Sequence, residues 1–422
     1  MTPGTSRYSR TTAAVAAVTL SAGGCTAVQD GAAARGVEPV NGVAVALLDP
    51  GSYPTTPRPP LGNAGNVVVG GWLDAQRMAE NVVGPWEVDS TLTETYSTPL
   101  DAGSRFLATL FTRKETSAMS LKGLLYGFQS GATSTGTQRS LMNYVLRFDD
   151  AKSASAAATS IRTAESNAAL YASDGELAHI TLNRSVKIPG RGDTAVVGYS
   201  IPGYYDTTTD VTMPAKNEVD AFTVHGQYLL FQHAEVTGPI DGAAGLVGKA
   251  LDLQVPEIDQ FIPTDVDKLT DLPRDPSGLL ALTLPNRKDP VLKRYGNLTL
   301  GPKGVLHFAG NPVRAAKELT DAGVDVTVNA GAWIHRARDG AAATALVDQM
   351  VRDQKAHGPY DDSVPNMPAS HCQQIAADVV KQRPARVQCF LPVDRYTVQI
   401  DASTLDEAQH QAAAQYLLLT AK

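Results

Sequence analysis

The sequence has few of the residues from which catalytic and metal sites are usually built. Three cysteines and eight histidines are scattered over 422 residues. No two cysteines have the C-x-x-C spacing of a redox pair or of half a zinc site. The enzyme motifs H-E-x-x-H, G-x-S-x-G and G-x-G-x-x-G are also absent. We therefore expect no catalytic residue, no metal ligand and no cofactor, although the distance between paired carboxylates is not visible in a sequence.

Long apolar runs and an excess of positive charge are missing as well. After the first 25 residues, the apolar runs at 44–48 and 246–255 are far shorter than the roughly 20 residues that span a bilayer. Lysine and arginine number 36 against 43 aspartates and glutamates, which gives a formal net charge of −7. Nucleic-acid binding needs a basic face, so this balance argues against a nucleic-acid partner. The hydrophobic content of 43% is nevertheless sufficient for packed cores.

The first 25 residues have the pattern of a lipoprotein signal peptide. Arg7 and Arg10 form a positive start, and Thr12–Leu20 is an uncharged run of signal-peptide length. Small residues then lead into Cys25, whose thiol can take a diacylglyceryl group and whose freed amino group can take a further chain such as palmitate. Two or three acyl chains hold a protein stably on a membrane. We expect residues 1–24 to be removed and Cys25 to be lipidated; the alternative is an ordinary secretory signal.

The other two cysteines, Cys372 and Cys389, form one even pair if Cys25 is acylated. Exported proteins meet an oxidising compartment, in which such pairs become disulfides. They are 17 positions apart, with a helix-like segment between them. A disulfide that closes a loop of this size contributes about 3 kcal/mol in the chain-entropy model. The sequence predicts a Cys372–Cys389 disulfide, and the alternative is two buried free thiols.

Residues 25–66 are predicted to be a Pro-rich tether. Pro54, Pro57, Pro59 and Pro60 lie within seven residues and favour an extended backbone without a packed core. Such a spacer would hold the folded part away from the membrane. The alternative is an ordered strap that lies against the first domain.

Residues 67–261 are predicted to form a first α+β domain. Apolar residues at helical spacing predict a helix near 72–82, and an alanine-rich helix is predicted after Asp149-Asp150. A helix at 241–253 closes the domain. Runs of β-forming residues predict antiparallel strands, at 104–113, 123–130, 141–148, 179–188, 193–201, 210–215 and 218–236.

Residues 262–296 contain five prolines and are predicted to be a linker. Residues 297–422 are predicted to form a second α+β domain whose last helix starts at Ser403 or Thr404 with a capping box. Strands are expected at 304–310, 324–337 and 386–402, and further helices from Asn311-Pro312, at 341–351 and at 371–382. In both domains we expect an antiparallel sheet covered by helices on one face.

Three segments share the order strand, short polar turn and alanine-rich helix. They are residues 143–162, 304–319 and 395–414. One interpretation is that the domains are duplicated modules of a common ancestor. The alternative is that strand-to-helix turns of this kind arise in any α+β domain.

Two sequence patterns resemble a phosphate-binding loop and a histidine metal site, but their spacing is wrong for either. Residues 242–249, GAAGLVGK, resemble a phosphate-binding loop but have one residue too many, and Ala250 replaces the hydroxyl residue that binds magnesium. His225 and His233 share a strand face but are too far apart to ligate one metal ion.

Several longer motifs resemble a family of lipoproteins from mycobacteria, nocardiae and their relatives. The similarity covers nearly all of the mature chain. It rests on YPTTPRPPLGNAG at 53–65, RMA at 77–79, GPWEVD at 84–89, YGF at 126–128, RYTVQI at 395–400 and HQAAAQYLLL at 410–419. The family is a two-part domain of unknown function, so the resemblance implies an architecture and a location in the cell envelope, and it implies no catalytic residue.

The sequence thus favours a non-enzymatic envelope lipoprotein that is anchored through Cys25 and holds a partner protein or an envelope lipid outside the cytoplasmic membrane. A second hypothesis is a carrier that encloses an acyl chain, with a large apolar cavity lined by residues from 106–231. A third is a hydrolase, which predicts a pocket where a serine or carboxylate meets a histidine of perturbed pKa.

Overall fold

The structure is a computed structural model. It describes residues 27–29, 32–34, 42–101, 121–136, 138–166, 181–183, 185–206, 211–286, 297–354, 362–377 and 384–421. The predicted signal peptide 1–24, Cys25 and the strand expected at 104–113 lie outside these ranges. Within them, no helix has both the length and the apolar character needed to cross a bilayer.

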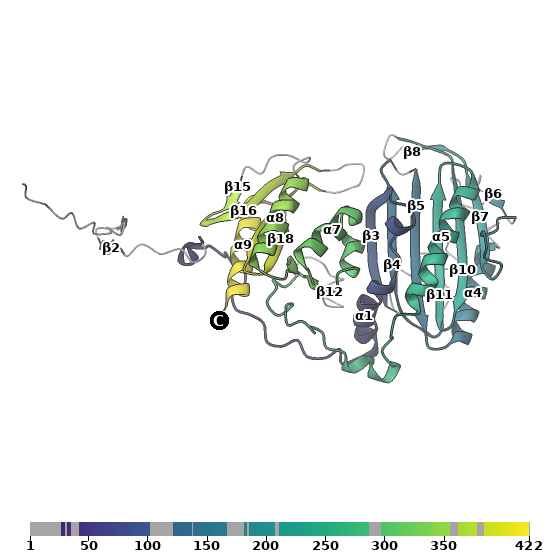
Figure 1. The fold of residues 1–422 in the computed structure, drawn as a ribbon, viewed down its shortest axis with the longest axis horizontal. Helices are drawn as coiled ribbons and strands as arrows, with labels where there is room; N and C mark the ends of the chain where they lie inside the picture. Colours follow the sequence, from purple (N-terminus) through teal and green to yellow (C-terminus); the bar gives the residue numbers. More distant parts are fainter. Residues whose placement is uncertain are drawn as a thin grey trace, which may run out of the picture.

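The first domain is built on a seven-stranded antiparallel sheet (Figure 1). Its strands lie in the order β3-β4-β5-β11-β10-β7-β6. Their bounds are Leu92–Asp101 (β3), Leu124–Ser134 (β4), Arg139–Phe148 (β5), Thr181–Asn183 (β6), Ala195–Ile201 (β7), Lys216–His225 (β10) and Tyr228–Val236 (β11). Two strand pairs lie outside this sheet, β1 (Ala27–Gln29) with β2 (Ala32–Ala34), and β8 (Tyr204–Asp206) with β9 (Val211–Met213).

The second domain has a seven-stranded antiparallel sheet of its own. Its strands lie in the order β12-β13-β14-β18-β17-β16-β15. Their bounds are Leu298–Leu300 (β12), Val326–Asn329 (β13), Trp333–Arg336 (β14), Asp362–Val364 (β15), Met367–Ile375 (β16), Arg386–Val393 (β17) and Tyr396–Ala402 (β18). The predicted fold class, α+β with two antiparallel sheets, is therefore confirmed.

The two sheets have the same topology. Counted along the chain, both have the strand order 1-2-3-7-6-5-4, and both place one helix after the third strand and one after the seventh. In the first domain these helices are α4 (Ala151–Ser166) and α5 (Ile240–Ile258), and in the second α8 (Gly340–Gln354) and α9 (Leu405–Thr420). Residues 143–162 form β5 and α4, and the equivalent segment of the second domain is therefore β14 with α8. The sequence similarity had suggested 304–319 or 395–414 instead.

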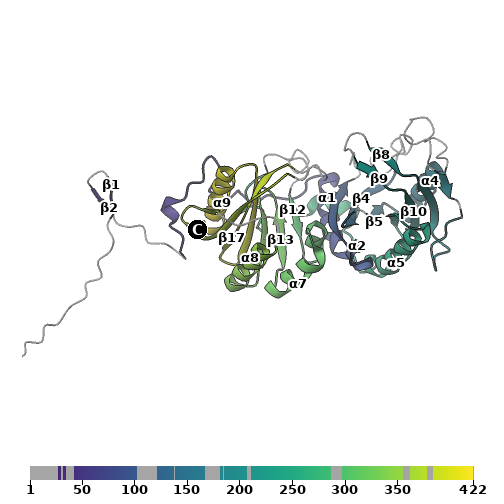
Figure 2. The same ribbon diagram turned by 90° about the horizontal axis from the view of Figure 1, so that it is seen from above.

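Helices lie on both faces of each sheet, and not on one face as expected. In β11, Leu229 and Phe231 pack in a core with α4, while Leu230 and Ala234 pack in the core beneath α5. Figure 2 shows the second sheet between α9 on one side and α8 with α7 (Pro312–Ala322) on the other. Each sheet therefore has two covered faces that differ in chemistry.

The helices begin where local chemistry predicts. The side chain of Thr404 accepts from the Glu407 amide at 3.2 Å, so Thr404 is the N-cap of α9. The Glu407 carboxylate accepts from the Ser403 amide at 3.1 Å, one residue before the position that the expected capping box requires. Asn311 caps α7 through the Arg314 amide at 3.1 Å, ahead of Pro312 at the first helical position.

Two expected elements of the second domain are different in the structure. Residues 304–310 were expected to be a strand, but Gly304–Phe308 form the 3-10 helix η6. Its first amides are capped by the carboxylate of Glu80, which accepts from the Gly304 amide at 2.6 Å. In the helix expected at 371–382, residues up to 375 belong to β16, because they pair with β17.

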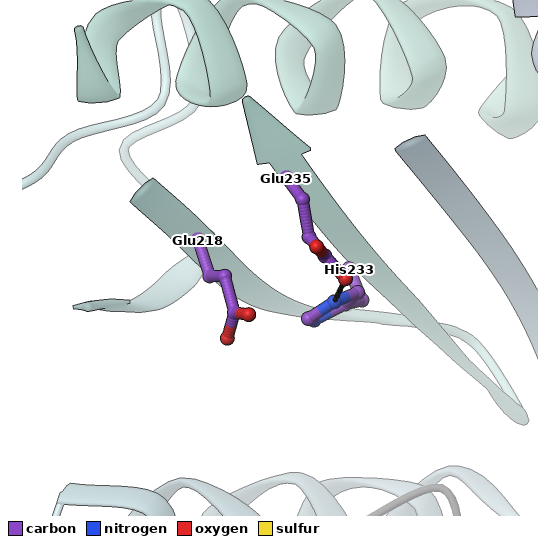
Figure 3. A group of neighbouring side chains, drawn as sticks. All are labelled: Glu218, His233 and Glu235. Carbon is purple, nitrogen blue, oxygen red and sulfur yellow. Dashed lines mark hydrogen bonds and ion pairs between the residues drawn. The ribbon is translucent and has the colours of Figure 1, made fainter. Parts of the chain in front are cut away.

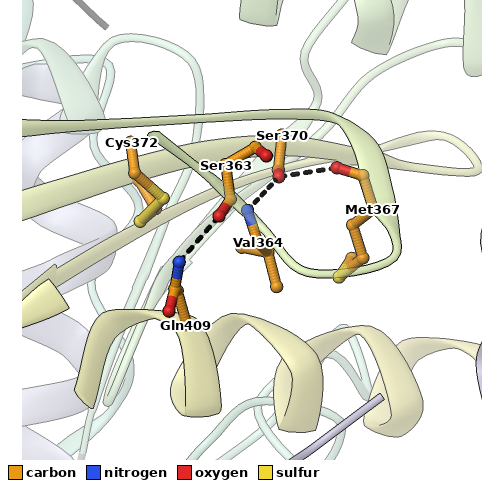
Figure 4. Close-up of a disulfide and its surroundings, with 7 residues drawn as sticks. Ser363, Val364, Met367, Ser370, Cys372 and Gln409 are labelled. Atoms are coloured by element: carbon orange, nitrogen blue, oxygen red, sulfur yellow. Dashed lines mark hydrogen bonds between the residues drawn. A yellow bond between two sulfur atoms is a disulfide. The ribbon is translucent and has the colours of Figure 1, made fainter. Parts of the chain in front are cut away.

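The predicted disulfide is present and joins neighbouring strands. Cys372 in β16 lies directly opposite Cys389 in β17, with Cα atoms 4.1 Å apart. Nearby, Ser370 Oγ accepts from the Val364 amide at 2.7 Å, which fixes β15 to β16 (Figure 4). Gln409 of α9 donates to the Ser363 carbonyl at 2.7 Å. This edge of the sheet is therefore held by a covalent link and by side-chain hydrogen bonds.

From residue 42 onward, the expected tether is an ordered strap, and it lies against the second domain. Val43 is buried in the apolar core of that domain, and Tyr53 packs against it. The hydroxyl of Tyr53 donates to Glu407 at 3.2 Å and accepts from Gln411 at 3.0 Å, both in α9. Arg58 donates through its amide to the Ala281 carbonyl at 3.0 Å. Proline has no backbone N–H, so the strap is held mainly by side-chain hydrogen bonds and by the few amides that remain, such as that of Arg58.

The chain segment after the first domain is fixed by a buried aspartate. Asp74 lies in α1 (Val67–Met78) and has no exposed surface. Its carboxylate accepts from the amide and hydroxyl of Thr264 at 2.9 and 2.8 Å, and also from Arg77 and the hydroxyl of Tyr126. Arg147 donates to the Tyr126 hydroxyl at 2.6 Å and to the Thr264 carbonyl at 2.7 Å.

The described part of the expected linker 262–296, residues 262–286, is consequently ordered. Val266–Asp271 form the 3-10 helix η5, which packs against α1. Three leucines further along are buried in the core of the second domain, namely Leu279, Leu280 and Leu284. Residues 287–296 lie outside the described part of the chain.

One apolar core is shared by the two domains. It joins residues of α1, η2 (Ala79–Asn81) and α2 (Pro85–Val88) with residues of β12, η6 and α7. Polar contacts reinforce it, since the Gln76 side chain accepts from the Thr299 amide at 2.7 Å and Thr95 donates to the Ala309 carbonyl at 2.8 Å. The domains are therefore packed as one body.

Candidate functional site

A histidine and several carboxylates meet on one face of the first sheet (Figure 3). Glu218, His233 and Glu235 have ligand-type atoms within 4.8 Å of one another. The β10–β11 pairing brings them together, because Glu218 lies opposite Glu235 and Asp220 lies opposite His233. The geometry by itself would suit a divalent cation.

The hydrogen bonds show instead that this cluster supplies its own positive charges. Lys216 Nζ lies 2.8 Å from Glu218 Oε1 and 2.7 Å from Glu235 Oε2, in the position that a cation would take. His233 Nδ1 lies 2.7 Å from Asp220 and its Nε2 lies 3.1 Å from Glu235, so both ring nitrogens are engaged. We name these five residues the compensated cluster.

The pKa directions fit a charged histidine. Burial alone would lower the pKa of His233, but Asp220 and Glu235 outweigh it and hold this pKa well above its usual value. Burial would raise the pKa of Glu235, but His233 and Lys216 bring it down to about 2. Both shifts favour the charged forms of His233 and Glu235, and an imidazolium is not a metal ligand.

A second histidine lies in the core between the domains. His307 of η6 has no exposed surface, and its ring lies between Trp86 and Phe128, with centroids 5.1 and 5.0 Å away. Its Nε2 lies 3.0 Å from the Ala79 carbonyl and its Nδ1 lies 2.7 Å from Ser130 Oγ. A carbonyl only accepts, so Nε2 carries the proton and Ser130 donates to Nδ1.

This serine–histidine pair matches part of what the hydrolase hypothesis predicts. Burial lowers the pKa of His307 to about 3, so the ring is neutral at physiological pH. A serine that donates to a neutral histidine is the arrangement of an activated nucleophile. However, neither Ser130 nor His307 has any exposed surface. The pair therefore connects the two domains and has no room for a substrate.

The second sheet has one apolar face and one polar face. Residues such as Val387, Leu391 and Ile400 belong to the apolar core beneath α9. The alternate positions face α7 and α8 and are largely polar, namely Thr327, His335, Gln388, Thr397, Gln399 and Asp401. Asp401 accepts from Gln388 at 3.0 Å and from Gln399 at 2.8 Å.

A cavity of about 260 Å³, which we name the inner cavity, lies between this polar face, α7 and α8. Three aromatic side chains line it, Phe308, Trp333 and Phe390. Glu318 of α7 and Asp353 of α8 line it as well. Burial raises the pKa of Glu318 to about 7, and the nearby Asp353 carboxylate adds to the rise.

The inner cavity has a larger neighbour of about 750 Å³, which we name the outer cavity. Trp333 and Gln399 line both cavities, so the two meet at these side chains. The outer cavity is otherwise bordered by the strap, the β13–β14 turn and α9, through residues that include Tyr53, Asn329, Asp401, Glu407 and Gln411. Amides, carboxylates and one phenol therefore line it together with apolar residues such as Leu284, Pro285 and Ala332.

A third cavity, of about 1100 Å³, lies on the first domain beside the start of α5. It is lined by residues of the 242–249 segment, including Gly242, Gly245 and Lys249. This segment lies entirely within α5, so it does not form a phosphate-binding loop. Lys249 donates to the Val88 carbonyl and Arg139 pairs with Asp89 at 2.7 Å, so both basic groups already have partners.

Sequence reasoning located few of these residues. The predicted lipidation residue, Cys25, lies outside the described chain, and the predicted disulfide was found. The compensated cluster has a visible signal, because ionisable residues occupy alternate positions at 218 and 220 and at 233 and 235 of the strand-like run 218–236, with Lys216 two positions before it. The inner cavity has no such signal, since Glu318, Asp353 and Gln388 lie on three separate elements.

Comparison with solved structures finds the extracellular domain of PknH from Mycobacterium tuberculosis. The likeness covers 44% of this chain and 97% of that chain, with 12% sequence identity and a TM-score of 0.27. A score this low does not show a shared fold, and we infer nothing from it. No curated protein sequence matches this chain.

Comparison with protein families gives a clear result. The N-terminal profile of a domain of unknown function, DUF7373, matches residues 61–274, and its C-terminal profile matches residues 279–422. Together the two profiles cover most of the sequence and meet within the ordered segment between the domains. The chain therefore belongs to the DUF7373 family, with both the N-terminal and the C-terminal domain of that family present.

Proposed function

We propose that this chain is a non-enzymatic protein of the cell envelope that is held on the outer face of the cytoplasmic membrane by a lipid on Cys25. Its role is to bind an envelope molecule or a partner protein. The observation that supports binding is the pair of polar cavities on the second domain, which are open while the histidines of the domain interface and the compensated cluster are engaged. The signal-like first 25 residues support the location.

The two other hypotheses have less support. The described apolar residues of β4, β5, β10 and β11 pack in the cores against α4 and α5, so these residues do not line the apolar cavity that an acyl carrier needs. The hydrolase hypothesis predicts a polar pocket around a serine or carboxylate and a histidine of perturbed pKa. Ser130 and His307 meet only the second of these conditions.

The location is tested by cell fractionation of a Cys25→Ala variant. Without its acyl chains the protein should move from the membrane fraction to the soluble fraction. A double Cys372→Ser, Cys389→Ser variant is the matched control, because it loses two cysteines but keeps Cys25, and it should stay with the membrane. A Cys25→Ala protein that remains in the membrane fraction would disprove the anchor.

Binding without turnover is tested on anchor-free protein exported by an actinobacterial host. Native mass spectrometry should detect a non-covalent ligand, or crosslinking on intact cells should recover a partner at the second domain. Extra mass that matches an acyl lipid would favour the carrier hypothesis instead. Bare protein in the first experiment and no crosslink in the second would contradict a binding role.

A further inference from the structure

The inner cavity is lined by hydrogen-bond acceptors that lack donors. Gln388 is only 4% exposed, and its carbonyl oxygen Oε1 has no hydrogen-bond partner among the described residues. Glu318 Oε1 and Asp353 Oδ2 have no hydrogen bond of good geometry either, but both are ion-paired with Arg314. Buried acceptors are normally satisfied, so the unpartnered Gln388 oxygen favours a ligand that donates to it. The cavity therefore suits a molecule that brings several donors.

The charges around the cavity disfavour an ion of either sign. Arg314 Nε lies 3.0 Å from Asp353 Oδ2 and 3.4 Å from Glu318 Oε1, outside hydrogen-bond geometry but close enough to balance their charge. Arg386 also lines the cavity and lies 3.4 Å from Asp401. A cation would meet two guanidinium groups, and an anion would meet the carboxylates. A neutral molecule with many donors avoids both penalties.

The aromatic side chains provide flat apolar surfaces beside these polar atoms. The Phe308 and Trp333 rings are 6.0 Å apart at an interplanar angle of 47°. Phe390, in β17, lines the same cavity. A volume of about 260 Å³ is just below the range of drug-sized sites, so it suits one small ring. Pyranose and furanose rings combine apolar C–H faces with hydroxyl donors at the rim.

The outer cavity extends this chemistry. It shares Trp333 and Gln399 with the inner cavity, and it adds Asn329, Gln411 and Tyr53. Amide and phenol groups can donate to and accept from neighbouring hydroxyls. A chain of rings that passes Trp333 would therefore meet both polar side chains and apolar surfaces, such as those of Leu284 and Pro285.

We propose that the inner and outer cavities together form a binding site for a neutral saccharide of two or more rings. One ring lies against Trp333 in the inner cavity and donates to Gln388, Glu318 and Asp353, and the next rings lie in the outer cavity. This inference rests on the proposed binding function and names its ligand class.

The test uses the folded anchor-free chain and a panel of defined soluble probes. These are oligomers of glucose, galactose, mannose and arabinose from one to four rings, with choline and inorganic phosphate as charged comparators. Ligand-observed NMR and calorimetry at millimolar concentration measure the binding. We expect at least one saccharide to bind, with tighter binding for two rings than for one, and neither charged probe to bind.

Variants connect the signal to this site. Trp333→Ala should weaken saccharide binding roughly tenfold through loss of the stacking surface, while Trp333→Phe, which keeps a ring, should retain most of it. Gln388→Leu should weaken it severalfold because one acceptor is lost. Asp321→Asn is the matched control, since it lies on α7 outside both cavities and should leave binding unchanged.

Three outcomes would overturn the proposal: no saccharide binds, a charged probe binds in place of the saccharides, or saccharide binding is indifferent to both Trp333→Ala and Gln388→Leu. None of these outcomes changes the membrane partition of Cys25→Ala or the recovery of a crosslinked partner. A failure here therefore differs visibly from a failure of the proposed function.

Discussion

The two sheets share one topology, but the face of the first sheet that is covered by α4 and the face of the second that is covered by α7 and α8 differ in their polar groups. On the first sheet, the charged groups of the compensated cluster are paired with one another, and Lys216 occupies the position that a cation would need. On the second sheet, α7 and α8 leave a cavity in which no described residue donates to the buried oxygen of Gln388. Charged side chains alone are therefore a poor guide to a binding site. The better guide is whether their hydrogen bonds are complete.

Substitutions in the compensated cluster should lower the free energy of unfolding more than substitutions around the inner cavity. His233→Leu leaves Asp220 and Glu235 without the imidazolium between them, and breaking a buried ion pair in this way costs about 3–5 kcal/mol. The free energy of unfolding from urea titration measures the loss.

His225→Leu is the matched control for this substitution. His225 ends the neighbouring strand β10 and pairs with Asp259 at 2.6 Å, but both side chains are partly exposed. An exposed pair is worth about 1 kcal/mol or less. Equal losses for the two variants would mean that the cluster is not held by mutual compensation.

The disulfide should matter only to the second sheet. Replacing Cys372 and Cys389 by serine removes a cross-link over a loop of 17 positions, worth about 3 kcal/mol in the chain-entropy model. Hydrogen exchange should speed up in β15, β16 and β17, which includes Gln388 of the inner cavity, while β4 and β5 keep their protection. Faster exchange in both sheets alike would show that the shared core transmits the change.

The pH dependence of thermal stability should report on Glu318 of the inner cavity. The folded pKa of Glu318, about 7, lies above its unfolded value, so the folded state binds more protons between roughly pH 4.5 and 7. Its stabilising contribution is full below the unfolded pKa and is lost as the pH rises through 7. Relative to wild type, Glu318→Gln should therefore gain thermal stability between pH 5 and 8.

His233 and Glu235 of the compensated cluster have pKa values displaced in opposite directions, that of His233 well above its usual value and that of Glu235 down to about 2, and they are the same in both proteins. The neutral His307 and His335, with pKa values lowered to about 3 and 4, favour unfolding as the pH falls below 6.5, and they do so equally in both proteins. The difference in melting temperature between wild type and Glu318→Gln isolates Glu318. A constant difference from pH 5 to 8 would contradict the assignment.

Added metal ions should have the smallest effect of all. The compensated cluster has the ligand atoms for a divalent cation, but Lys216 and the doubly engaged His233 oppose binding. Manganese, zinc or EDTA should leave the melting temperature unchanged. A rise with zinc in wild type would show that the metal displaces Lys216, and the same measurement on Lys216→Ala gives the response of an open site.

Local patterns in the sequence predicted the elements that are locally determined. The Thr404 cap of α9, the proline start of α7 and the strand-forming residues of 218–236 all have their partners within a few residues or across one turn. The disulfide was predictable because only one pair of cysteines remained after Cys25. Even the register of the compensated cluster follows from the hairpin turn at Gly226.

Elements that depend on distant partners were not predictable. Residues 304–308 have a strand-like composition, but Glu80, more than 200 positions earlier, caps them as a 3-10 helix. The Pro-rich strap and residues 262–286 have no periodic pattern, and they are ordered by α9 and by Asp74. The inner cavity likewise needs α7, α8 and β17 to meet, and no single stretch of sequence contains it.

The strap also sets which domain lies next to the tether. It passes over the second domain before the chain enters α1 of the first, and Val43 is the first residue buried along it (Figure 1). The chain from residue 25 to residue 42 reaches at most roughly 60 Å when fully extended. If Cys25 carries the proposed lipid, the tether therefore joins the folded part of the molecule at the second domain. The two cavities of that domain would then lie on the part of the molecule that is tied directly to the membrane.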